Sequence, residues 1–199
     1  MKKTKITGII LAGGKSSRMG RDKGWIELNN KPLINYAIEA LKPHCDELVI
    51  SSNSTEYKLL GYPVYEDKIK NCGPMGGIYS SLLYSSSRLN MVLSCDMPLI
   101  SFELIKYILV KCIEGKLSVP IHGANLMEPL CAVYPLEAIP HIEKSIKEEK
   151  LKLVDLVNSI PNEQIKIDPS QYFYHPDLFL NINKPGDLEK ASSLLIMAS

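Results

Sequence analysis

A short apolar run near the start of the chain, Ile9 to Ala12, stops at two consecutive glycines, Gly13 and Gly14. An apolar run that ends at glycine is typical of a buried strand leading into a loop. Because glycine has no side chain, the backbone of such a loop can approach a ligand closely and can adopt positive φ. The sequence therefore predicts a buried first strand that opens into a loop whose main chain is available for binding.

The residues after the glycines are mostly cations and hydroxyls. Four basic side chains and two serines lie between Lys15 and Lys23. Backbone N–H groups followed by cations suit a polyphosphate, because each contact is then a charge-assisted hydrogen bond. The stretch is not a P-loop, which would need a glycine where the chain has Ile9, and its glycines lack the spacing of the dinucleotide fingerprint. The alternative is a glycine turn beside a solvated basic patch.

Runs typical of strands alternate with helical patterns in the first half of the chain. Further strand-like runs cover 48–50, 62–65 and 91–95, and apolar residues at helical spacing cover 33–41, about 78–85 and 104–112. This alternation predicts an α/β protein in which a mostly parallel, twisted sheet lies between two layers of helices, that is, a three-layer αβα fold.

The rhythm changes after residue 116. The runs 118–121 and 129–134 predict a strand pair that could be antiparallel, and two short helical patterns follow. We expect an edge strand at 164–167, another strand at 179–183 and a last helix from Pro185, preceded by Lys184, which is a poor helix cap. Because no repeat or linker interrupts the chain, we expect one domain over 1–199 with a small antiparallel addition in its C-terminal half.

Polar side chains follow several predicted strands at the point where each strand ends. Ser51, Asp67 and Asp96 all occupy such positions. Ligands of parallel sheets gather at the carboxyl ends of the strands, so these residues are candidates for one shared site. Asp96 is the candidate metal ligand, because Mg²⁺ usually takes one or two carboxylates and completes its shell with substrate phosphates and water. The alternative for Asp96 is a structural acid that initiates a turn or caps the following helix.

The overall composition excludes several classes of function. The formal net charge is +1 and 45% of the residues are hydrophobic, so no global field attracts nucleic acid or an acidic membrane. The five cysteines form no C-x-x-C pair, which argues against a zinc site or a disulfide framework and favours a reducing compartment. We see neither an export signal nor the roughly 20 apolar residues of a membrane span, and we expect a cytoplasmic protein without nucleic-acid or membrane partners.

The stretch from Leu11 to Lys23 resembles, without a gap, the signature Leu-Ala-Gly-Gly-x-Ser-x-Arg-Met-Gly-x-Asp-Lys of the molybdenum cofactor guanylyltransferases. The segments 73–77, 95–98 and 181–183 resemble later motifs of the same family. The resemblance implies a Rossmann-like nucleotidyltransferase fold in which 1–115 binds the nucleotide and 116–199 binds the acceptor. It implies transfer of GMP from GTP to molybdenum-molybdopterin, which gives molybdopterin guanine dinucleotide and pyrophosphate, with Mg²⁺ as the cofactor and other molybdenum cofactor biosynthesis proteins among the partners.

The same resemblance assigns roles to individual residues. It implies that Arg18, Lys23 and Asp96 are catalytic and that Asp96 also holds the metal. It implies that Asn181 and Asn183 face the pterin substrate. The residues implied to bind the nucleotide come from the first loop and the later strand ends: Leu11, Ala12, Gly13, Gly14, Lys23, Ser51, Asp67, Gly76 and Asp96.

Three other functions stay open from the sequence. A cytidylyltransferase that acts on the same pterin has a similar first loop, although Asp22-Lys23 favours the guanylyl branch. A sugar-1-phosphate nucleotidyltransferase, or another nucleotidyltransferase, is a more distant alternative. The third is a nucleotide-binding regulatory module without catalysis, and the presence of Asp96 argues against it.

Overall fold

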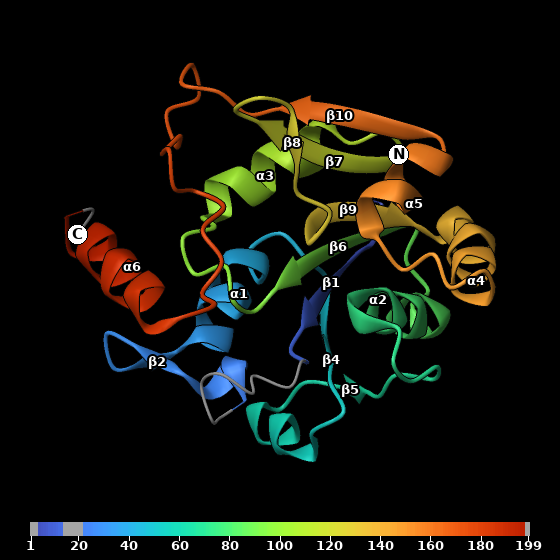
Figure 1. Cartoon of the computed structure of the whole chain (residues 1–199), viewed down its shortest axis with the longest axis horizontal. Coiled ribbons are helices and arrows are strands. Elements are labelled where there is room, and N and C mark those ends of the chain that lie inside the picture. Colours follow the sequence, from blue (N-terminus) through green and yellow to red (C-terminus); the bar gives the residue numbers. More distant parts are fainter. Residues whose placement is uncertain (1–3, 14–21, 198–199) are drawn as a thin grey trace.

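The computed structural model describes residues 4–13 and 22–197. Among these residues the central element is an eight-stranded sheet with the order β10-β7-β9-β6-β1-β4-β5, in which β8 pairs with β7 (Figure 1). Its strands are β1 (Ile6–Leu11), β4 (Glu47–Ser51), β5 (Val64–Tyr65), β6 (Leu89–Ser94), β7 (Leu117–His122), β8 (Leu126–Met127), β9 (Cys131–Pro135) and β10 (Asn162–Lys166). A separate two-stranded sheet consists of β2 (Glu27–Leu28) and β3 (Lys31–Pro32).

The pairing within the central sheet is mostly parallel. β1 is parallel to both of its neighbours, β4 and β6, and β5 is parallel to β4. β9 is antiparallel to β6 and β7, whereas β10 is parallel to β7. The direction of β9 follows from its connection, because a short hairpin joins it to β7 and parallel strands need a long crossover. The predicted mostly parallel sheet with an antiparallel addition in the C-terminal half is confirmed.

Helices cover both faces of the sheet. One layer contains α1 (Leu33–Leu41) and α3 (Phe102–Lys111), and the other contains α2 (Gly73–Tyr84), α4 (Ile139–Lys147) and α5 (Leu153–Ser159) (Figure 1). The three-layer prediction is therefore confirmed. The remaining helical segments are α6 (Pro185–Met197) and the 3₁₀ turns η1 (Lys23–Trp25), η2 (Thr55–Leu60) and η3 (Leu136–Ala138).

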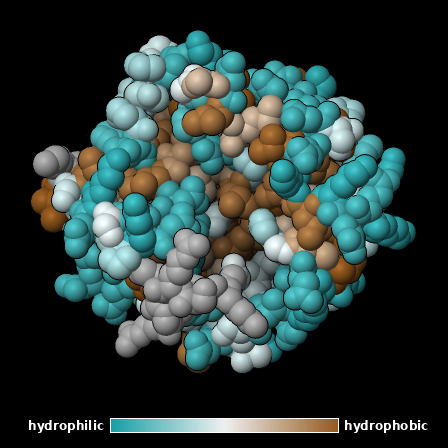
Figure 2. Space-filling view, viewed as in Figure 1, coloured by the Kyte–Doolittle hydropathy of each residue, from teal (hydrophilic) through white to brown (hydrophobic). Residues whose placement is uncertain are grey.

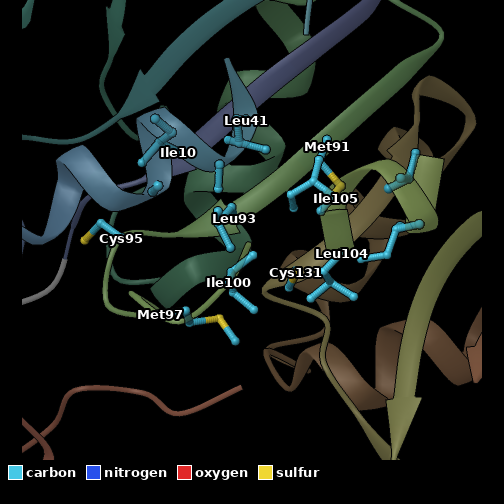
Figure 3. Close-up of a cluster of buried hydrophobic side chains, with 14 of the residues drawn as sticks. Ile10, Leu41, Met91, Leu93, Cys95, Met97, Ile100, Leu104, Ile105 and Cys131 are labelled. Carbon is cyan, nitrogen blue, oxygen red and sulfur yellow. The ribbon is translucent and has the colours of Figure 1, made fainter. Parts of the chain in front are cut away.

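A separate apolar cluster fills the space on each face of the sheet. Ile10, Met91 and Leu93 belong to the cluster beneath α1 and α3 (Figure 3). Ile9 and Val92 belong to the cluster beneath α2, α4 and α5. Successive residues of one strand thus enter opposite clusters, as the alternation of side chains along a strand requires. Because β1 and β6 are buried on both faces, their sequences read as continuous apolar runs.

The strand predicted at 179–183 is not formed. Turn hydrogen bonds hold the preceding residues, and Ile182 N donates to Asp96 O at 2.8 Å, just beyond the end of β6. β6 already pairs with β1 and β9, so no edge of β6 is free and the segment crosses the carboxyl ends of the strands instead. Phe179 and Ile182 are nevertheless buried, as apolar residues of a strand would be.

The start of α2 lies earlier than the sequence predicts. The helix begins at Gly73 and includes Gly76 and Gly77, whereas the apolar spacing predicts a start at about residue 78. Glycine costs about 1 kcal/mol relative to alanine inside a helix, but a side chain does not fit here, because a Cβ on Gly77 would lie 2.6 Å from Ser51 Oγ. Close packing of the helix against the end of β4 therefore outweighs helix propensity.

An acid inside the first turn of α6 binds the main chain of the residues just before the helix. Asp187 Oδ2 accepts hydrogen bonds from Asn183 N at 2.9 Å and from Lys184 N at 3.0 Å. This is the half of a capping box in which a residue of the first turn accepts from the N–H group at the cap position. No helix in the described ranges has the length and apolar content to cross a bilayer.

Replacement of Leu93 by alanine should lower the free energy of unfolding by about 2–5 kcal/mol, because it leaves a cavity in the core. Leu93 is completely buried, whereas Val110 on α3 is 72% exposed and provides the control. The variant Val110→Ala should change stability by no more than about 0.5 kcal/mol. Urea unfolding followed by circular dichroism measures both values, and equal effects would contradict the packing described.

Candidate active site

The carboxyl ends of three neighbouring strands stop in one row of the sheet. Leu11 at the end of β1 is in register with Ser51 of β4 and with Ser94 of β6. Backbone hydrogen bonds continue this pairing past the strand ends, from Ala12 N to Ser51 O at 2.9 Å and from Cys95 N to Leu11 O at 3.1 Å. The glycine loop and Asp96 therefore leave adjacent strands at the same edge, as the sequence predicts.

The face of the molecule in Figure 2 is hollowed near its centre, and hydrophobic residues lie at the bottom of the hollow. In the same view of Figure 1 this region contains the end of β6, which pairs with the start of β9. Gly13 is exposed, and an added Cβ would find no atom within 4 Å. The described end of the first loop is thus open. Gly14 and Arg18, two of the predicted site residues, lie outside the described residues.

Three residues that are distant in the sequence meet at this edge. Lys23 Nζ donates hydrogen bonds to Asp96 Oδ2 at 2.9 Å and to Asn183 Oδ1 at 2.7 Å. Ser94 Oγ donates to the other carboxylate oxygen, Asp96 Oδ1, at 2.6 Å. The side chains of Lys23 and Asp96 are 23% and 13% exposed, so the pair is largely shielded but reachable from solvent. This Lys23–Asp96–Asn183 cluster contains two of the predicted catalytic residues and one predicted acceptor residue.

A second group of predicted residues gathers around the start of α2. Asp67 Oδ2 accepts a hydrogen bond from Asn53 Nδ2 at 3.1 Å, and Asp67 N donates to Asn53 Oδ1 at 3.2 Å. A Cβ on Gly77 would lie 3.5 Å from Asp67 Oδ1 and 3.4 Å from Leu11 Cδ2, in addition to its collision with Ser51. Asp67, Ser51 and the glycines of α2 therefore lie together, and Leu11 connects them to the first cluster.

The two predicted acceptor residues differ in their surroundings. Asn183 joins the Lys23–Asp96–Asn183 cluster, whereas Asn181 Nδ2 donates to Phe179 O at 3.2 Å within its own segment. The amide of Asn181 therefore stabilises the segment that crosses the strand ends. Asn183 is brought to the predicted catalytic residues and Asn181 is not.

The sequence analysis did not identify the residues that hold the turn before Lys23. Tyr57 of η2 is completely buried, and its hydroxyl donates to Asp22 Oδ1, which also accepts from Gly24 N at 3.1 Å. The rings of Trp25 and Tyr57 stack with centroids 5.1 Å apart. A Cβ on Gly24 would lie 2.3 Å from the Tyr57 hydroxyl oxygen. These contacts fix the main chain on both sides of Lys23.

Burial, followed by the hydrogen bond to Asp22, raises the pKa of Tyr57 well above its ordinary value. The phenol therefore stays protonated and remains a donor to Asp22 over the physiological pH range. A single tyrosine in a polar segment without apolar periodicity gives no sequence signal for this role. Its contact with Asp22 exists only because the turns η1 and η2 pack together.

The thiols near the site are core residues. Cys95 and Cys131 are buried, and burial raises the pKa of each thiol. A thiol with a raised pKa is a poor nucleophile because the thiolate is the reactive form. The polar side chains of the first cluster at this edge are therefore the cation, the carboxylate and the amide.

Comparison with known proteins decides to which family the chain belongs. The family model described as "MobA-like NTP transferase domain" matches residues 8–160, which include both clusters described above except for Asn183. The chain belongs to the MobA-like NTP transferase domain family. This family contains nucleotidyltransferases, in agreement with a site in which a lysine and a carboxylate lie at the strand ends.

Relatives of this family match the chain over nearly its whole length. The molybdenum cofactor guanylyltransferase of Yersinia pestis is 36% identical, with 92% of this chain and 93% of the relative covered. The enzyme of the same name from Vibrio vulnificus is 32% identical over 96% of this chain and 97% of its own. The crystal structure of molybdopterin-guanine dinucleotide biosynthesis protein A from Archaeoglobus fulgidus superimposes with a TM-score of 0.80 at 23% identity, covering 96% and 99% of the two chains.

The substitution Tyr57→Phe should lower kcat for pyrophosphate release by about tenfold, the effect of losing a hydrogen bond to a charged group that orients Lys23. The ring stack with Trp25 is kept, so circular dichroism should be unchanged. The control Tyr107→Phe removes a hydroxyl on α3, where the ring contacts Phe173 with centroids 5.5 Å apart. If both variants change kcat equally, Tyr57 does not position Lys23.

Proposed function

We propose that this chain transfers GMP from GTP to molybdenum-molybdopterin, forming molybdopterin guanine dinucleotide and releasing pyrophosphate. The observation that carries the proposal is the Lys23–Asp96–Asn183 cluster. Lys23 binds Asp96 at 2.9 Å within the proposed nucleotide-binding part, 1–115, and binds Asn183 of the proposed acceptor-binding part, 116–199, at 2.7 Å. The names of the relatives, molybdenum cofactor guanylyltransferase, support the choice of nucleotide and acceptor.

The nucleotide would lie across the end of β1. Leu11, Ala12 and Gly13 lie at the end of this strand, where Gly13 is exposed, and Gly14 and Arg18 follow in the sequence. A triphosphate is held there by backbone N–H groups and guanidinium, each of which makes a charge-assisted hydrogen bond.

The ribose and base would lie over the second group of residues. Ser51, Asp67 and Gly76 surround the start of α2, and the two helix glycines leave no side chain between this group and Leu11. Asp67 keeps its carboxylate exposed beside Asn53, and a carboxylate accepts hydrogen bonds from a ribose hydroxyl or from the N–H groups of a guanine edge.

Asp96 would hold a Mg²⁺ ion. Its carboxylate is 13% exposed at the strand ends, and one carboxylate suffices because Mg²⁺ takes its other ligands from phosphates and water. Among the described residues no three His, Cys, Asp or Glu side chains are grouped as an all-protein site would need. When bound, the ion supplies neutralisation of phosphate charge. Ser94 keeps the carboxylate oriented through its 2.6 Å hydrogen bond.

The reaction requires no covalent enzyme intermediate. An oxygen of the acceptor's terminal phosphate forms a bond to the α-phosphorus of GTP, the bond from the α-phosphorus to the bridging oxygen breaks, and pyrophosphate leaves with the electron pair. Lys23 is paired with Asp96 in the described structure and would turn its ammonium group toward the phosphates when the nucleotide binds. Asn183, which now accepts from Lys23, would then be free to contact the acceptor. Positioning and charge stabilisation do the catalytic work.

The place of action is part of the same proposal. All five cysteines are free thiols, which supports a reducing, cytoplasmic compartment. Other proteins of molybdenum cofactor biosynthesis would deliver the pterin and receive the product.

The choice of nucleotide is tested by pyrophosphate release with GTP and CTP in parallel, using molybdenum-molybdopterin as the acceptor. We expect a preference for GTP of at least about tenfold in kcat/KM. A preference for CTP would favour the cytidylyltransferase alternative and overturn the proposal. Tight GTP binding without pyrophosphate release would favour a regulatory module.

The variant Lys23→Ala should lose at least about tenfold in kcat/KM, since a hydrogen bond to a charged group is worth about 1.5–3 kcal/mol. The control is Lys116→Ala. Lys116 directly precedes β7 at the opposite, amino edge of the sheet and its side chain is 41% exposed. Equal losses in the two variants would indicate a general effect of charge and would remove Lys23 from the site.

A further inference from the structure

A histidine and a glutamate form a pair at the end of β7 that the function described above does not use. His122 Nε2 and Glu128 Oε1 are 2.8 Å apart, and their side chains are 19% and 18% exposed. The ring of His122 also stacks on Phe179, with centroids 4.6 Å apart and planes 27° apart. Phe179 belongs to the segment that carries Asn181 and Asn183, so the pair lies beside the predicted acceptor residues.

The His122–Glu128 pair lies at the same edge of the sheet as Asp96. β7 and β6 are both antiparallel to β9, so β7 and β6 point the same way and both end at the carboxyl edge. Leu130 O, two residues after Glu128, accepts the 2.9 Å hydrogen bond from Ser94 N. The edge thus continues from Asp96 to Glu128 on the acceptor side of the molecule.

The main chain around Glu128 is held firmly. Glu128 N donates to Pro120 O and Glu128 O accepts from Cys131 N, each at 3.0 Å. The next residue, Pro129, accepts at 2.9 Å from the hydroxyl of Tyr134, which is completely buried. The carboxylate is therefore presented from a rigid turn, as a specificity-determining group requires.

The carboxylate itself has capacity for a ligand. Burial raises the pKa of Glu128, against the opposing effect of His122. Within the described residues His122 is the hydrogen-bond partner of Oε1, and Oε2 has none. A shielded carboxylate has about four acceptor positions and is costly to leave unpaired. Two adjacent N–H donors in one plane would satisfy it through a bidentate contact.

We propose that Glu128 accepts hydrogen bonds from the 2-amino group and N3–H of the acceptor's pteridine ring, and that His122 orients this carboxylate. The inference rests on the proposed function, since that function makes the acceptor a pterin. The 2-amino-4-oxo edge of a pterin offers the two parallel donors that the carboxylate needs. Glu128 is then the residue that selects the pterin ring, and His122 is a positioning residue that acts through it.

The test is the ratio of affinities for two probes, pterin and lumazine, titrated by their fluorescence. Lumazine has a carbonyl oxygen in place of the 2-amino group and so offers one donor fewer. We expect the wild-type protein to prefer pterin by about tenfold or more, the effect of one hydrogen bond to a charged group. Glu128→Gln should abolish or reverse this preference, because the amide of glutamine can donate to the lumazine carbonyl. His122→Phe keeps a ring against Phe179 and should reduce the preference.

The control is Glu137→Gln, which makes the same chemical change on η3 at an exposed position and should leave the ratio unchanged. A pterin preference that is retained in Glu128→Gln, or absent from the wild-type protein, would overturn the inference. GTP affinity, measured by calorimetry, should be the same in all variants. Failure of the proposed function is distinguishable, because a protein that releases no pyrophosphate from GTP could still show a pterin preference that depends on Glu128.

Discussion

The parallel pairing of β1 with β4 and β6 is the constraint on which the whole site depends. It ends the three strands in one row, with Leu11 between Ser51 and Ser94. Asp96 follows that row by two residues, and Lys23 and Asn183, which come from other segments, meet it there. A slip of one residue in the pairing would turn each side chain of the strand to the opposite face. Ile9 and Ile10 of β1 would then exchange the apolar clusters into which they pack.

The Lys23–Asp96–Asn183 cluster joins the two ends of the chain across a separation of 160 residues. A largely shielded ion pair is weak support for stability, because loss of hydration offsets much of the attraction. Its presence is better explained by chemistry at the strand ends. Contacts around the cluster hold its residues in place. Tyr57 and Asp22 fix the turn before Lys23, and Ile182 N donates a hydrogen bond to Asp96 O.

The local signals in the sequence predicted most of the fold. Strong apolar patterns predicted the strands β1, β4 and β6 and the helices α1 and α3. The alternation of these strands and helices predicted the three layers. Two predictions were wrong: α2 begins before residue 78, and residues 179–183 form no strand. Gly77 is a helical residue because no side chain fits against Ser51, and the segment with Phe179 is buried without belonging to the sheet. Both outcomes depend on neighbours that are distant in the sequence.

The sequence by itself determined which residues could carry the chemistry, since the glycine loop, Lys23 and Asp96 stand where predicted strands end and where side chains of parallel strands converge. Only the tertiary structure decided which of them meet. It brought Asn183 to Lys23 while leaving Asn181 within its own segment, and it added Tyr57 and the His122–Glu128 pair. The physical reason is that periodicity reports the environment of one strand or helix, whereas a hydrogen bond between distant residues depends on how separate elements pack.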